Sequence, residues 1–587
     1  MLTKQNIMTT IVKEKKAVKF ENITGSEAVI RSLINENVET IFGYPGGAIM
    51  PIYDALYDFN KELKHILTRH EQGAIHAAEA FAKVSGKPGI VFATSGPGAT
   101  NLITGLANAM VDSTPVICIT GQVHSHLLGF NAFQETDIVG ISMPVTKWNY
   151  QITSAKEIPE VLAKAFYLAK TGRPGPVLID ITKDAQLEKF DSFYQKTDKI
   201  PTYYPYPKIK KETILEAAEL INNSKKPLVL AGQGIKISGA EEELKTFINK
   251  TGIPVASTLL GLTSFPSNHP LYFGMPGMHG SYAPNIKSNE ADLIIAVGMR
   301  FDDRVTGDTS RYVKNAKVIH IDIDASEIDK NIKTNVAING DAKKVLKELI
   351  PAVNQKKHEQ WVNEFNELKK EEYNKVIEID ILPNTEKFRP AEIIYTISGK
   401  CREDAVVVTD VGQHQMMAAR YYSLNTKNKF ITSGGLGTMG FGLPASFGAS
   451  MAAPDKQVVL FVGDGGFQMT IQELDTIRRN LSNIKIVLLN NSYLGMVRQW
   501  QELFNKKRYS FTNMDNPDFI KIAEAYSIKG RRVIKREELD SAVEQMFADD
   551  NPFFLEVVVE REDNVFPMVP GGASVSDIIL TKNDLKK

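Results

Sequence analysis

Two apolar runs in the last third of the chain predict neighbouring strands of a buried parallel sheet. Residues 458–462 and 484–489 are apolar almost throughout and lack the alternation of a half-exposed strand. Between them, residues 470–473 have the form of a capping box, and apolar residues then recur at helical spacing as far as Ile477. The pattern predicts a strand–helix–strand unit whose two strands point the same way.

The same layout recurs near the amino terminus. A strand is predicted at 90–94, a Ser-Gly-Pro-Gly loop follows at 95–98, and an Ala- and Leu-rich helix then leads to a strand at 115–120. Because two distant segments share this order, we predict two similar α/β domains in one chain.

A third unit is predicted between these two. Apolar strands at 227–231, 291–297 and 318–323 alternate with helical stretches, which favours another doubly wound sheet. The expected fold class is therefore α/β, with three doubly wound parallel-sheet domains. We place the three domains at residues 20–190, 208–345 and 380–570.

The connections between the predicted domains differ in character. Residues 200–207 accumulate Pro and Tyr and lose all periodicity, which is typical of a linker. Residues 343–383 carry dense Lys and Glu around Leu, Val and Trp361, which predicts an amphipathic helix with a solvated face.

Composition narrows the class of partner. Among 587 residues, Lys plus Arg and Asp plus Glu are equal at 69 each, so no basic stripe indicates a nucleic acid. Cys118 and Cys401 are the only cysteines and lie in different segments, which argues against a disulfide framework. No apolar stretch approaches the roughly 20 residues of a membrane helix, and the amino terminus lacks the apolar core of a signal peptide. We expect a cytoplasmic enzyme that acts on small molecules, with no membrane or nucleic-acid partner. We also expect the amino terminus to be frayed.

Short polar segments follow both apolar runs of the last third. Gly463-Asp464-Gly465 ends the first run and Asn490-Asn491 ends the second. Parallel strands bring these segments to one edge of the sheet, where doubly wound folds bind ligands. Mg²⁺ takes one or two carboxylates and fills its other positions with neutral oxygens and phosphates. Either segment alone is ordinary turn chemistry; the pair predicts a clamp for a metal and a diphosphate.

With this pair of segments the chain resembles the thiamine diphosphate enzymes over nearly its whole length. The resemblance implies thiamine diphosphate and Mg²⁺ as cofactors. It also implies that the metal is held by the side chains of Asp464 and Asn491 and by the backbone carbonyl of Tyr493. In this family the amino-terminal domain binds the aminopyrimidine ring and the carboxyl-terminal domain binds the diphosphate.

The chemistry of thiamine requires one protected carboxylate beside the aminopyrimidine, because that ring becomes basic when an acid shares a proton with it. Glu71 matches the activating glutamate of the family. By itself, a Glu in the first turn of a helix is usually only a favourable partner of the helix dipole. Since Glu71 and the clamp lie in different domains, which come from different subunits in the family, the resemblance implies at least a homodimer, or a homotetramer.

Further positions match residues that contact thiamine diphosphate in the family. These positions are Gln134, Gln413, His414, Gly437, Thr438, Met439, Gly465, Gly466, Met469, Gly495 and Met496. Methionines at such positions are, taken singly, more often core residues.

The middle of the chain is similar to the acetohydroxyacid synthases in particular. Residues 172–176, 274–280 and 298–307 match their FAD-binding and substrate-binding segments, and glycines there would allow a nucleotide to approach the backbone. Each segment alone could be a glycine turn. The matching FAD positions are Ser113, Arg173, Gly232, Thr258, Leu259, Pro276, Gly277, Met278, His279, Gly298, Met299, Arg300, Phe301, Asp302, Asp322, Ile323, Asp341 and Ala342.

The substrate positions implied by this resemblance are fewer. Arg304 would hold the carboxylate of the second 2-keto acid, a role suited to a forked guanidinium. Trp500 would favour an acceptor with an extra methylene, a preference worth only about 1–3 kcal/mol. Gly47, Gln134 and Lys183 also fall on family substrate or catalytic positions.

The implied activity is the decarboxylation of pyruvate and condensation of its hydroxyethyl group with pyruvate or 2-oxobutyrate. The products, 2-acetolactate and 2-aceto-2-hydroxybutyrate, lead to valine, leucine and isoleucine. FAD would be structural, and relatives usually have a separate small regulatory subunit. The alternatives are a flavin-dependent pyruvate oxidase, a non-catalytic nucleotide-binding regulator, which leaves the clamp unexplained, and a nicotinamide dehydrogenase, whose glycine motif is not evident.

Overall fold

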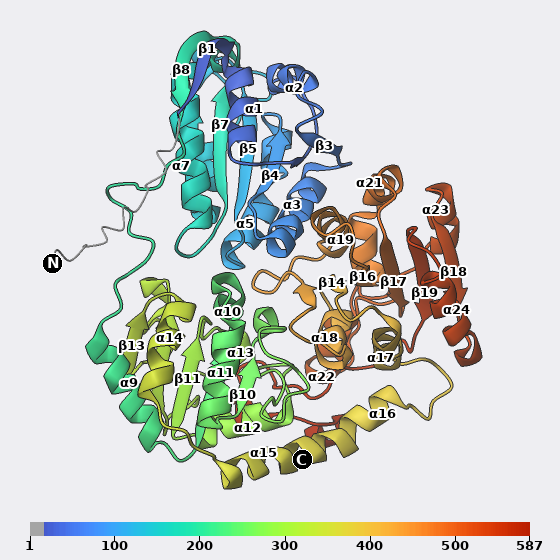
Figure 1. Ribbon diagram of the computed structural model, residues 1–587. Helices are drawn as coiled ribbons and strands as arrows, with labels where there is room; N and C mark the ends of the chain where they lie inside the picture. Colours follow the sequence, from blue (N-terminus) through green and yellow to red (C-terminus); the bar gives the residue numbers. More distant parts are fainter. Residues whose placement is uncertain (1–16, 587) are drawn as a thin grey trace, which may run out of the picture.

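The computed structural model describes residues 17–586 and divides them among three α/β units (Figure 1). Each unit has its own sheet in which all pairings are parallel, with helices on both faces. The predicted fold class is confirmed. Residues 1–16, on which the expected fraying falls, lie outside the described residues. Within 17–586 no helix has both the length and the apolar character needed to cross a membrane.

The amino-terminal unit contains a six-stranded sheet with strand order β3-β2-β4-β5-β7-β6. A short antiparallel pair, β1 (Val18–Thr24) with β8 (Lys189–Tyr194), closes one end. The sheet strands are β2 (Thr40–Gly43), β3 (Lys64–Leu67), β4 (Gly89–Ala93), β5 (Val116–Gln122), β6 (Trp148–Ile152) and β7 (Val177–Thr182). The helices are α1 (Gly25–Asn35), α2 (Met50–Tyr57), α3 (Glu71–Ser85), α4 (Pro97–Thr100), α5 (Ile103–Val111), α6 (Ile138–Ser142), α7 (Ile158–Lys170) and α8 (Lys183–Leu187).

The central unit contains a five-stranded sheet with strand order β10-β9-β11-β12-β13. Its strands are β9 (Pro227–Ala231), β10 (Val255–Ser257), β11 (Leu293–Val297), β12 (Lys317–Asp322) and β13 (Val336–Asn339). Its helices are α9 (Lys211–Asn223), α10 (Gln233–Ser238), α11 (Glu241–Thr251), α12 (Tyr282–Glu290), α13 (Asp303–Thr306) and α14 (Ala342–Ala352). The three strands predicted from apolar runs are all present.

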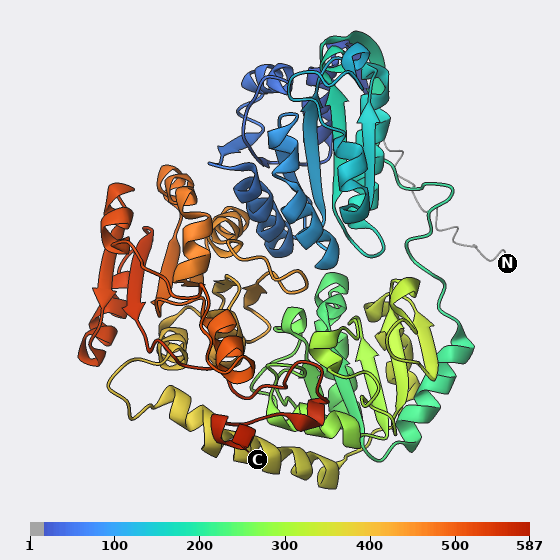
Figure 2. The same cartoon turned by 180° about the vertical axis from the view of Figure 1, so that it is seen from behind.

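The carboxyl-terminal unit contains a six-stranded sheet with strand order β15-β14-β16-β17-β19-β18. Its strands are β14 (Val406–Thr409), β15 (Lys429–Ile431), β16 (Val458–Gly463), β17 (Ile484–Asn490), β18 (Lys529–Val533) and β19 (Phe553–Val558). Its helices are α17 (Pro390–Lys400), α18 (Gln413–Tyr421), α19 (Gly442–Ala452), α20 (Asp464–Met469), α21 (Leu474–Asn480), α22 (Gly495–Phe504), α23 (Phe519–Ala525) and α24 (Leu539–Met546). After this sheet the chain turns back, and its last segment lies beside the central unit (Figure 2), where Gly307 bridges to Ser574.

Both predicted connections interact with a neighbouring unit. In the linker 200–207, the Tyr203 hydroxyl donates to the Thr171 carbonyl at 2.7 Å. The segment 343–383 is helical, as predicted, but its first part is α14 of the central unit. The rest forms α15 (Glu359–Glu372) and α16 (Glu378–Ile381), which run along the base of the molecule (Figure 1). Trp361 is buried on the inner face of α15, so the helix is amphipathic. The domain boundaries themselves stay a prediction.

The capping box predicted at 470–473 is wrong. The Thr470 hydroxyl donates to the Gly440 carbonyl at 2.9 Å instead of capping a helix, and α21 begins only at Leu474. The carboxylate of Glu473 accepts the backbone N–H of Arg69 at 3.0 Å, from the amino-terminal unit. Tertiary partners have replaced the local hydrogen bonds that the sequence pattern favours.

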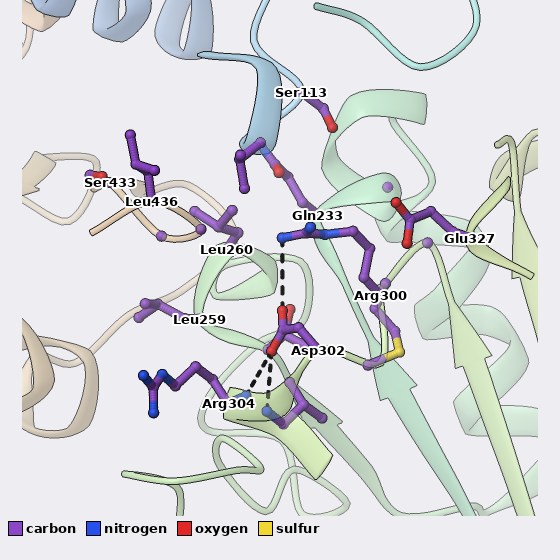
Figure 3. Close-up of a pocket in the computed structure, with 18 of the residues that line it drawn as sticks. Ser113, Gln233, Leu259, Leu260, Arg300, Asp302, Arg304, Glu327, Ser433 and Leu436 are labelled. Carbon is purple, nitrogen blue, oxygen red and sulfur yellow. Dashed lines mark hydrogen bonds and ion pairs between the residues drawn. The ribbon is translucent and has the colours of Figure 1, made fainter. Parts of the chain in front are cut away.

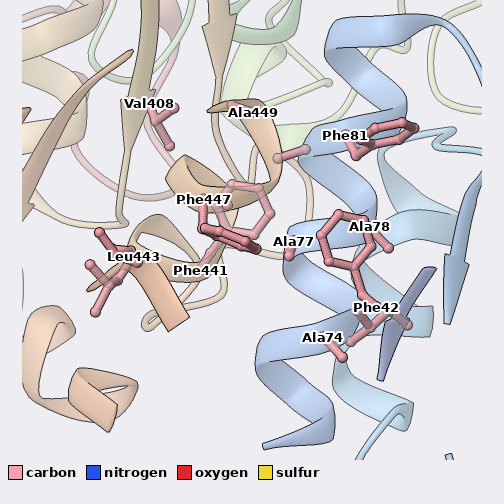
Figure 4. Packing of buried hydrophobic residues seen from close by; sticks show 14 of the residues in the cluster. Phe42, Ala74, Ala77, Ala78, Phe81, Val408, Phe441, Leu443, Phe447 and Ala449 are labelled. Carbon is pink, nitrogen blue, oxygen red and sulfur yellow. The ribbon is translucent and has the colours of Figure 1, made fainter. Parts of the chain in front are cut away.

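Close packing of α3 against α19 joins the amino-terminal and carboxyl-terminal units (Figure 4). A Cβ at Gly448 would lie 1.9 Å from the Ala77 carbonyl oxygen, so only glycine permits this approach of the two backbones. Phe447 fills the space beside it and contacts Phe42 of β2 edge to face, with ring centroids 6.2 Å apart. One continuous apolar core therefore spans both units.

Replacing Gly448 with Ala is expected to lower the free energy of unfolding by about 2–4 kcal/mol, because the three atoms that the new Cβ would meet are all backbone atoms of Ala77, which cannot yield without separating the helices. Thermal and denaturant unfolding would measure the loss. Gly399→Ala in α17 is the matched control, since a Cβ there meets no atom of the described residues within 4 Å. This substitution is expected to raise the free energy of unfolding by up to about 1 kcal/mol. Equal effects of the two substitutions would contradict this account of the interface.

Candidate functional site

The polar segments after β16 and β17 meet at one edge of the carboxyl-terminal sheet, as predicted. The two strands pair in parallel with Gly463 opposite Leu489, so Asp464 and Asn491 follow the strands at the same level. Both residues line one small cavity, together with Tyr493. Asp464 begins α20 and is almost fully buried, and this burial raises the pKa of its carboxyl to about 6.

Asn516 is a partner of this group that the sequence reasoning missed. Its Nδ2 donates to Asp464 Oδ2 at 2.6 Å and to Asn490 Oδ1 at 3.0 Å. On the other side, the amide oxygen of Asn491 accepts the Tyr493 N–H at 3.1 Å. Asn516 lies far along the chain from both motifs, and no local pattern of residues marks it.

Glycines in the wall of this small cavity pack directly against neighbouring side chains. A Cβ at Gly466 would lie 2.4 Å from Asp410 Oδ1, and one at Gly495 would lie 2.1 Å from Gln413 Oε1. His414 is buried in the same wall, its Nε2 has no hydrogen-bond partner among the described residues, and burial lowers the pKa of its ring to about 4. One carboxylate, a neutral amide oxygen and close glycines form a donor set that suits Mg²⁺ with a diphosphate. Of the residues proposed from the resemblance, this cavity gathers Gln413, His414, Met439, Asp464, Gly465, Gly466, Asn491, Tyr493, Gly495 and Met496.

A second, larger cavity of 860 Å³ lies where the three units meet (Figure 3). The amino-terminal unit contributes Ser113 and Arg173, and the carboxyl-terminal unit contributes Met439 and Trp500. The sequence-predicted residues that line it are Ser113, Arg173, Thr258, Leu259, Pro276, Met278, His279, Gly298, Met299, Arg300, Asp302, Arg304, Asp322, Ile323, Asp341, Ala342, Gly437, Met439, Met496 and Trp500. A mainly apolar cavity of this size, with polar groups at a few points, suits a nucleotide-sized ligand.

Two arginines that line this cavity differ in how closely carboxylates of the protein pair with their guanidinium groups. The guanidinium of Arg173 donates to Ser113 Oγ at 2.9 Å and pairs with Asp324 and Glu327, two partners that the sequence did not suggest. Arg304 is largely exposed to the cavity, and its closest carboxylate, Asp303, is 3.7 Å away. Arg300, the third arginine of the cavity, has its nearest carboxylate, Asp302, 3.8 Å away. Arg300 and Arg304 therefore both keep guanidinium N–H groups for the carboxylate of a ligand.

Backbone donors fix three of the five acidic residues that line the cavity. Asp302 Oδ1 accepts the N–H groups of Arg304 and Val305, which starts α13 (Figure 3). Asp322 accepts the N–H of Asp324 at 2.8 Å, and burial raises its pKa to about 6. Asp341 caps α14 through the N–H of Lys344. Each therefore keeps oxygen lone pairs for a further donor such as a ribose hydroxyl.

Trp500 lies on α22, facing the large cavity. A Cβ at Gly571 would be 3.3 Å from the indole ring, so the carboxyl-terminal segment limits the ring's movement. Phe504 packs against it with ring centroids 5.2 Å apart. The indole is thereby held as one wall of the cavity.

Four predicted residues of the amino-terminal unit line neither cavity. Glu71, Gly47, Gln134 and Lys183 all follow strands or loops at the carboxyl edge of the amino-terminal sheet. Glu71 Oε2 accepts Asn101 Nδ2 at 2.9 Å. A Cβ at Gly96 would lie 3.0 Å from the Cα of Gln134. One chain therefore forms this group but does not place it with the clamp of its own carboxyl-terminal unit.

The remaining predicted residues support the cavities from outside or lie on the surface. A Cβ at Gly277 would lie 2.1 Å from the Arg304 carbonyl, and one at Gly232 would lie 2.1 Å from the Gly298 carbonyl. Phe301 is buried, and Met469 is 55% exposed. Within residues 17–586, the Thr438 hydroxyl is buried without a hydrogen-bond partner. Apolar lining residues missed by the sequence reasoning include Leu260, Leu436 and Val497, which carry no motif.

Comparisons with known proteins agree with this arrangement. Family models of thiamine pyrophosphate enzymes match the N-terminal TPP binding domain at residues 23–141, the central domain at 214–349 and the C-terminal TPP binding domain at 410–557. The acetolactate synthase large subunit of Lactococcus lactis is 46% identical over 96% of this chain and 97% of its own length. That of Corynebacterium glutamicum is 44% identical over 98% and 93%, and the isozyme 2 large subunit of Escherichia coli is 44% identical over 95% and 99%. The chain belongs to the thiamine pyrophosphate enzymes and, within them, to the family of acetolactate synthase large subunits.

Proposed function

We propose that this chain is the catalytic subunit of an acetolactate synthase that works with thiamine diphosphate, Mg²⁺ and FAD. It decarboxylates pyruvate and joins the resulting two-carbon unit to pyruvate or 2-oxobutyrate, for the synthesis of branched-chain amino acids. The observation that carries this proposal is the meeting of the two cavities, because Met439 and Met496 line both. A cofactor held by its diphosphate in the small cavity would reach the large one, where Arg304 and Trp500 lie.

The residues of the small cavity would bind and orient the cofactor. Asp464, Asn491 and the carbonyl of Tyr493 would hold Mg²⁺, and Gly465 and Gly466 would let the diphosphate approach the backbone. When bound, thiamine diphosphate supplies the electron sink that a 2-keto acid needs in order to lose CO₂. The protein contributes position and electrostatics.

Glu71 would share a proton with the aminopyrimidine of a cofactor bound to a second copy of the chain. The single chain keeps Glu71 out of both cavities. Large apolar side chains of the same unit are exposed, including Met50 at 59%, Tyr57 at 77% and Phe133 at 88%, and burying such side chains against a second copy would be favourable. We therefore propose a homodimer, or a homotetramer built from such dimers.

The large cavity would hold FAD in a structural role, since the proposed reaction has no net oxidation. Asp322 and Asp341 would accept ribose hydroxyls, and Arg173 would face the phosphates or ring if its pairs with Asp324 and Glu327 opened. Arg304 would bind the carboxylate of the acceptor. The Trp500 ring would favour 2-oxobutyrate by contact with its extra methylene.

Two further proposals concern a partner subunit and the location of the protein in the cell. The relatives are named as large subunits, which supports a separate small subunit as partner. Cys118 and Cys401 are both unpaired, which fits a reducing compartment and a cytoplasmic location.

The purified chain with Mg²⁺, thiamine diphosphate, FAD, pyruvate and 2-oxobutyrate is expected to form both acetohydroxy acids without reducing the flavin. Glu71→Gln should lower turnover at least about 100-fold, because it removes the shared proton but keeps the shape. Glu62→Gln, at an exposed position of the same unit, is the control and should leave turnover unchanged. Flavin reduction with acetate or acetyl phosphate as product would instead assign the chain to the oxidases. Near-normal turnover of Glu71→Gln at saturating cofactor would overturn the role of Glu71.

Asp464→Asn is expected to stabilise the cofactor-free protein while abolishing Mg²⁺-dependent binding of thiamine diphosphate. The pKa of Asp464 is raised from 3.8 to about 6 in the folded chain, a difference that corresponds to about 3 kcal/mol. Above pH 6 the folded state bears the cost of a buried carboxylate, whereas below pH 3.8 the group is protonated in both states. The gain in unfolding free energy should therefore be full above pH 6 and vanish as the pH falls towards 4.

Denaturant unfolding of both proteins between pH 4 and 8 would measure this gain, and calorimetry would measure cofactor binding. A variant less stable than the parent at pH 7 would contradict the cost assigned to the buried carboxylate. Unchanged Mg²⁺-dependent binding would remove Asp464 from the clamp.

A further inference from the structure

A buried chain of hydrogen bonds begins on α3 in the amino-terminal unit. His76 Nδ1 and Glu79 Oε1 are 2.8 Å apart, and Glu79 Oε2 accepts Asn108 Nδ2 of α5 at 2.5 Å. All three side chains have no exposed surface. Burying polar groups in a core costs free energy unless every partner is in place, so such a chain is not needed for stability alone.

The chain then crosses into the carboxyl-terminal unit. The Ser433 hydroxyl donates to Asn108 Oδ1 at 2.5 Å and accepts the backbone N–H of Thr438 at 2.8 Å. The order of donors fixes the orientation of the Asn108 amide, because its nitrogen must face Glu79 and its oxygen must face Ser433. The position of one N–H in the segment 432–441 therefore depends on a side chain of the other unit.

A second contact from the amino-terminal unit holds the same segment. Asp112 accepts the N–H groups of Gly434 at 3.1 Å and Gly435 at 2.8 Å. Lys83 of α3 donates to Asp112 at 2.8 Å and to the Thr432 carbonyl at 2.9 Å. Hydrogen bonds from the amino-terminal unit thus hold the start of the segment at Thr432, Gly434 and Gly435.

Residues of the segment 432–441 line both cavities, so the two sets of contacts act on the walls of the site. Gly437 and Met439 line the large cavity, and Met439 also lines the clamp. The Thr438 hydroxyl is buried and has no partner in this structure. The backbone of 437–439 therefore faces the place where, on the function proposed above, the aminopyrimidine ring would lie.

We propose that Glu79, Asn108 and Ser433 are positioning residues, which set the backbone of 437–439 for the aromatic ring of thiamine diphosphate. The inference rests on the proposed function for the identity of that ring. It also gives the amino-terminal unit a second role, because α3 and α5 shape the cofactor site of their own chain while the carboxyl edge of the sheet presents Glu71 to another copy.

Ser433→Ala tests the proposal, because it removes the acceptor of the Thr438 N–H and the donor to Asn108 together. We expect about tenfold weaker binding of thiamine diphosphate with Mg²⁺ by calorimetry (~1.4 kcal/mol), and faster hydrogen exchange in peptides covering 433–441. The KM for pyruvate should stay unchanged. Ser446→Ala is the matched control, since it also removes a buried serine hydroxyl, one that only donates to the Leu443 carbonyl within its own helix.

An exchange of two side chains tests the order of donors and also serves if Ser433→Ala fails to fold. Asn108→Asp places a carboxylate against Glu79 and should weaken cofactor binding in the same way. Adding Glu79→Gln lets the new amide donate to the carboxylate at position 108 while Ser433 still donates from the other side, so the double variant should recover most of the affinity.

The outcomes separate this inference from the proposed function. Faster exchange at 433–441 with unchanged cofactor affinity, or no recovery in the double variant, would overturn the positioning role while the parent protein still formed acetohydroxy acids. A parent protein that bound thiamine diphosphate but formed no such product would overturn the proposed function. In that case, comparing the affinities of the parent and Ser433→Ala proteins for thiamine diphosphate would still decide the role of Ser433.

Discussion

The packing of α3 on α19 is the constraint from which the rest of the site follows. The two helices approach so closely at Gly448 and Ala77 that their backbones touch, and a single apolar core forms around the contact. Because protein interiors are close-packed and transmit displacement, the amino-terminal and carboxyl-terminal units cannot turn relative to one another without opening this core. The same packing fixes where the first residue of α3, Glu71, presents its carboxylate.

Around this contact, each unit uses the carboxyl edge of its own parallel sheet. Asp464 and Asn491 follow strands of one sheet, and Asp322 ends a strand of the central sheet. Polar side chains can gather at these edges without interrupting the buried strands, because they begin where the strands end. The large cavity joins the carboxyl edges of the central and carboxyl-terminal sheets, whereas the amino-terminal unit contributes Ser113 and Arg173, which precede β5 and β7.

The local patterns of the sequence predicted those features that depend on a few neighbouring residues. Continuous apolar runs predicted strands β16, β17, β9 and β11 within a few residues, because a strand buried on both faces tolerates little else. The juxtaposition of Asp464 with Asn491 followed from the parallel pairing alone. Many of the FAD positions came from the resemblance and line one cavity in the structure.

Features that depend on distant partners could not be predicted in this way. The capping pattern at Thr470 is locally sound, yet Gly440 and Arg69 take its hydrogen bonds in the folded chain. Asn516 and Asn108 look like ordinary polar residues, and only the fold shows that each joins two separate segments. By contrast, the resemblance implied that Glu71 lies apart from the clamp of its own chain, and Glu71 lines neither cavity in the structure.

The central claim, that each site combines Glu71 of one copy with Asp464 of another, is tested most directly by mixing two inactive variants. Glu71→Gln chains and Asp464→Asn chains would be unfolded, combined in equal amounts and refolded together, and product formation would be measured. Random pairing in a two-fold dimer should restore about one quarter of the parent activity, because half of the dimers are mixed and each has one intact site. No recovery, with both variants refolded and paired, would show that Glu71 and Asp464 act within the same chain and would contradict the account.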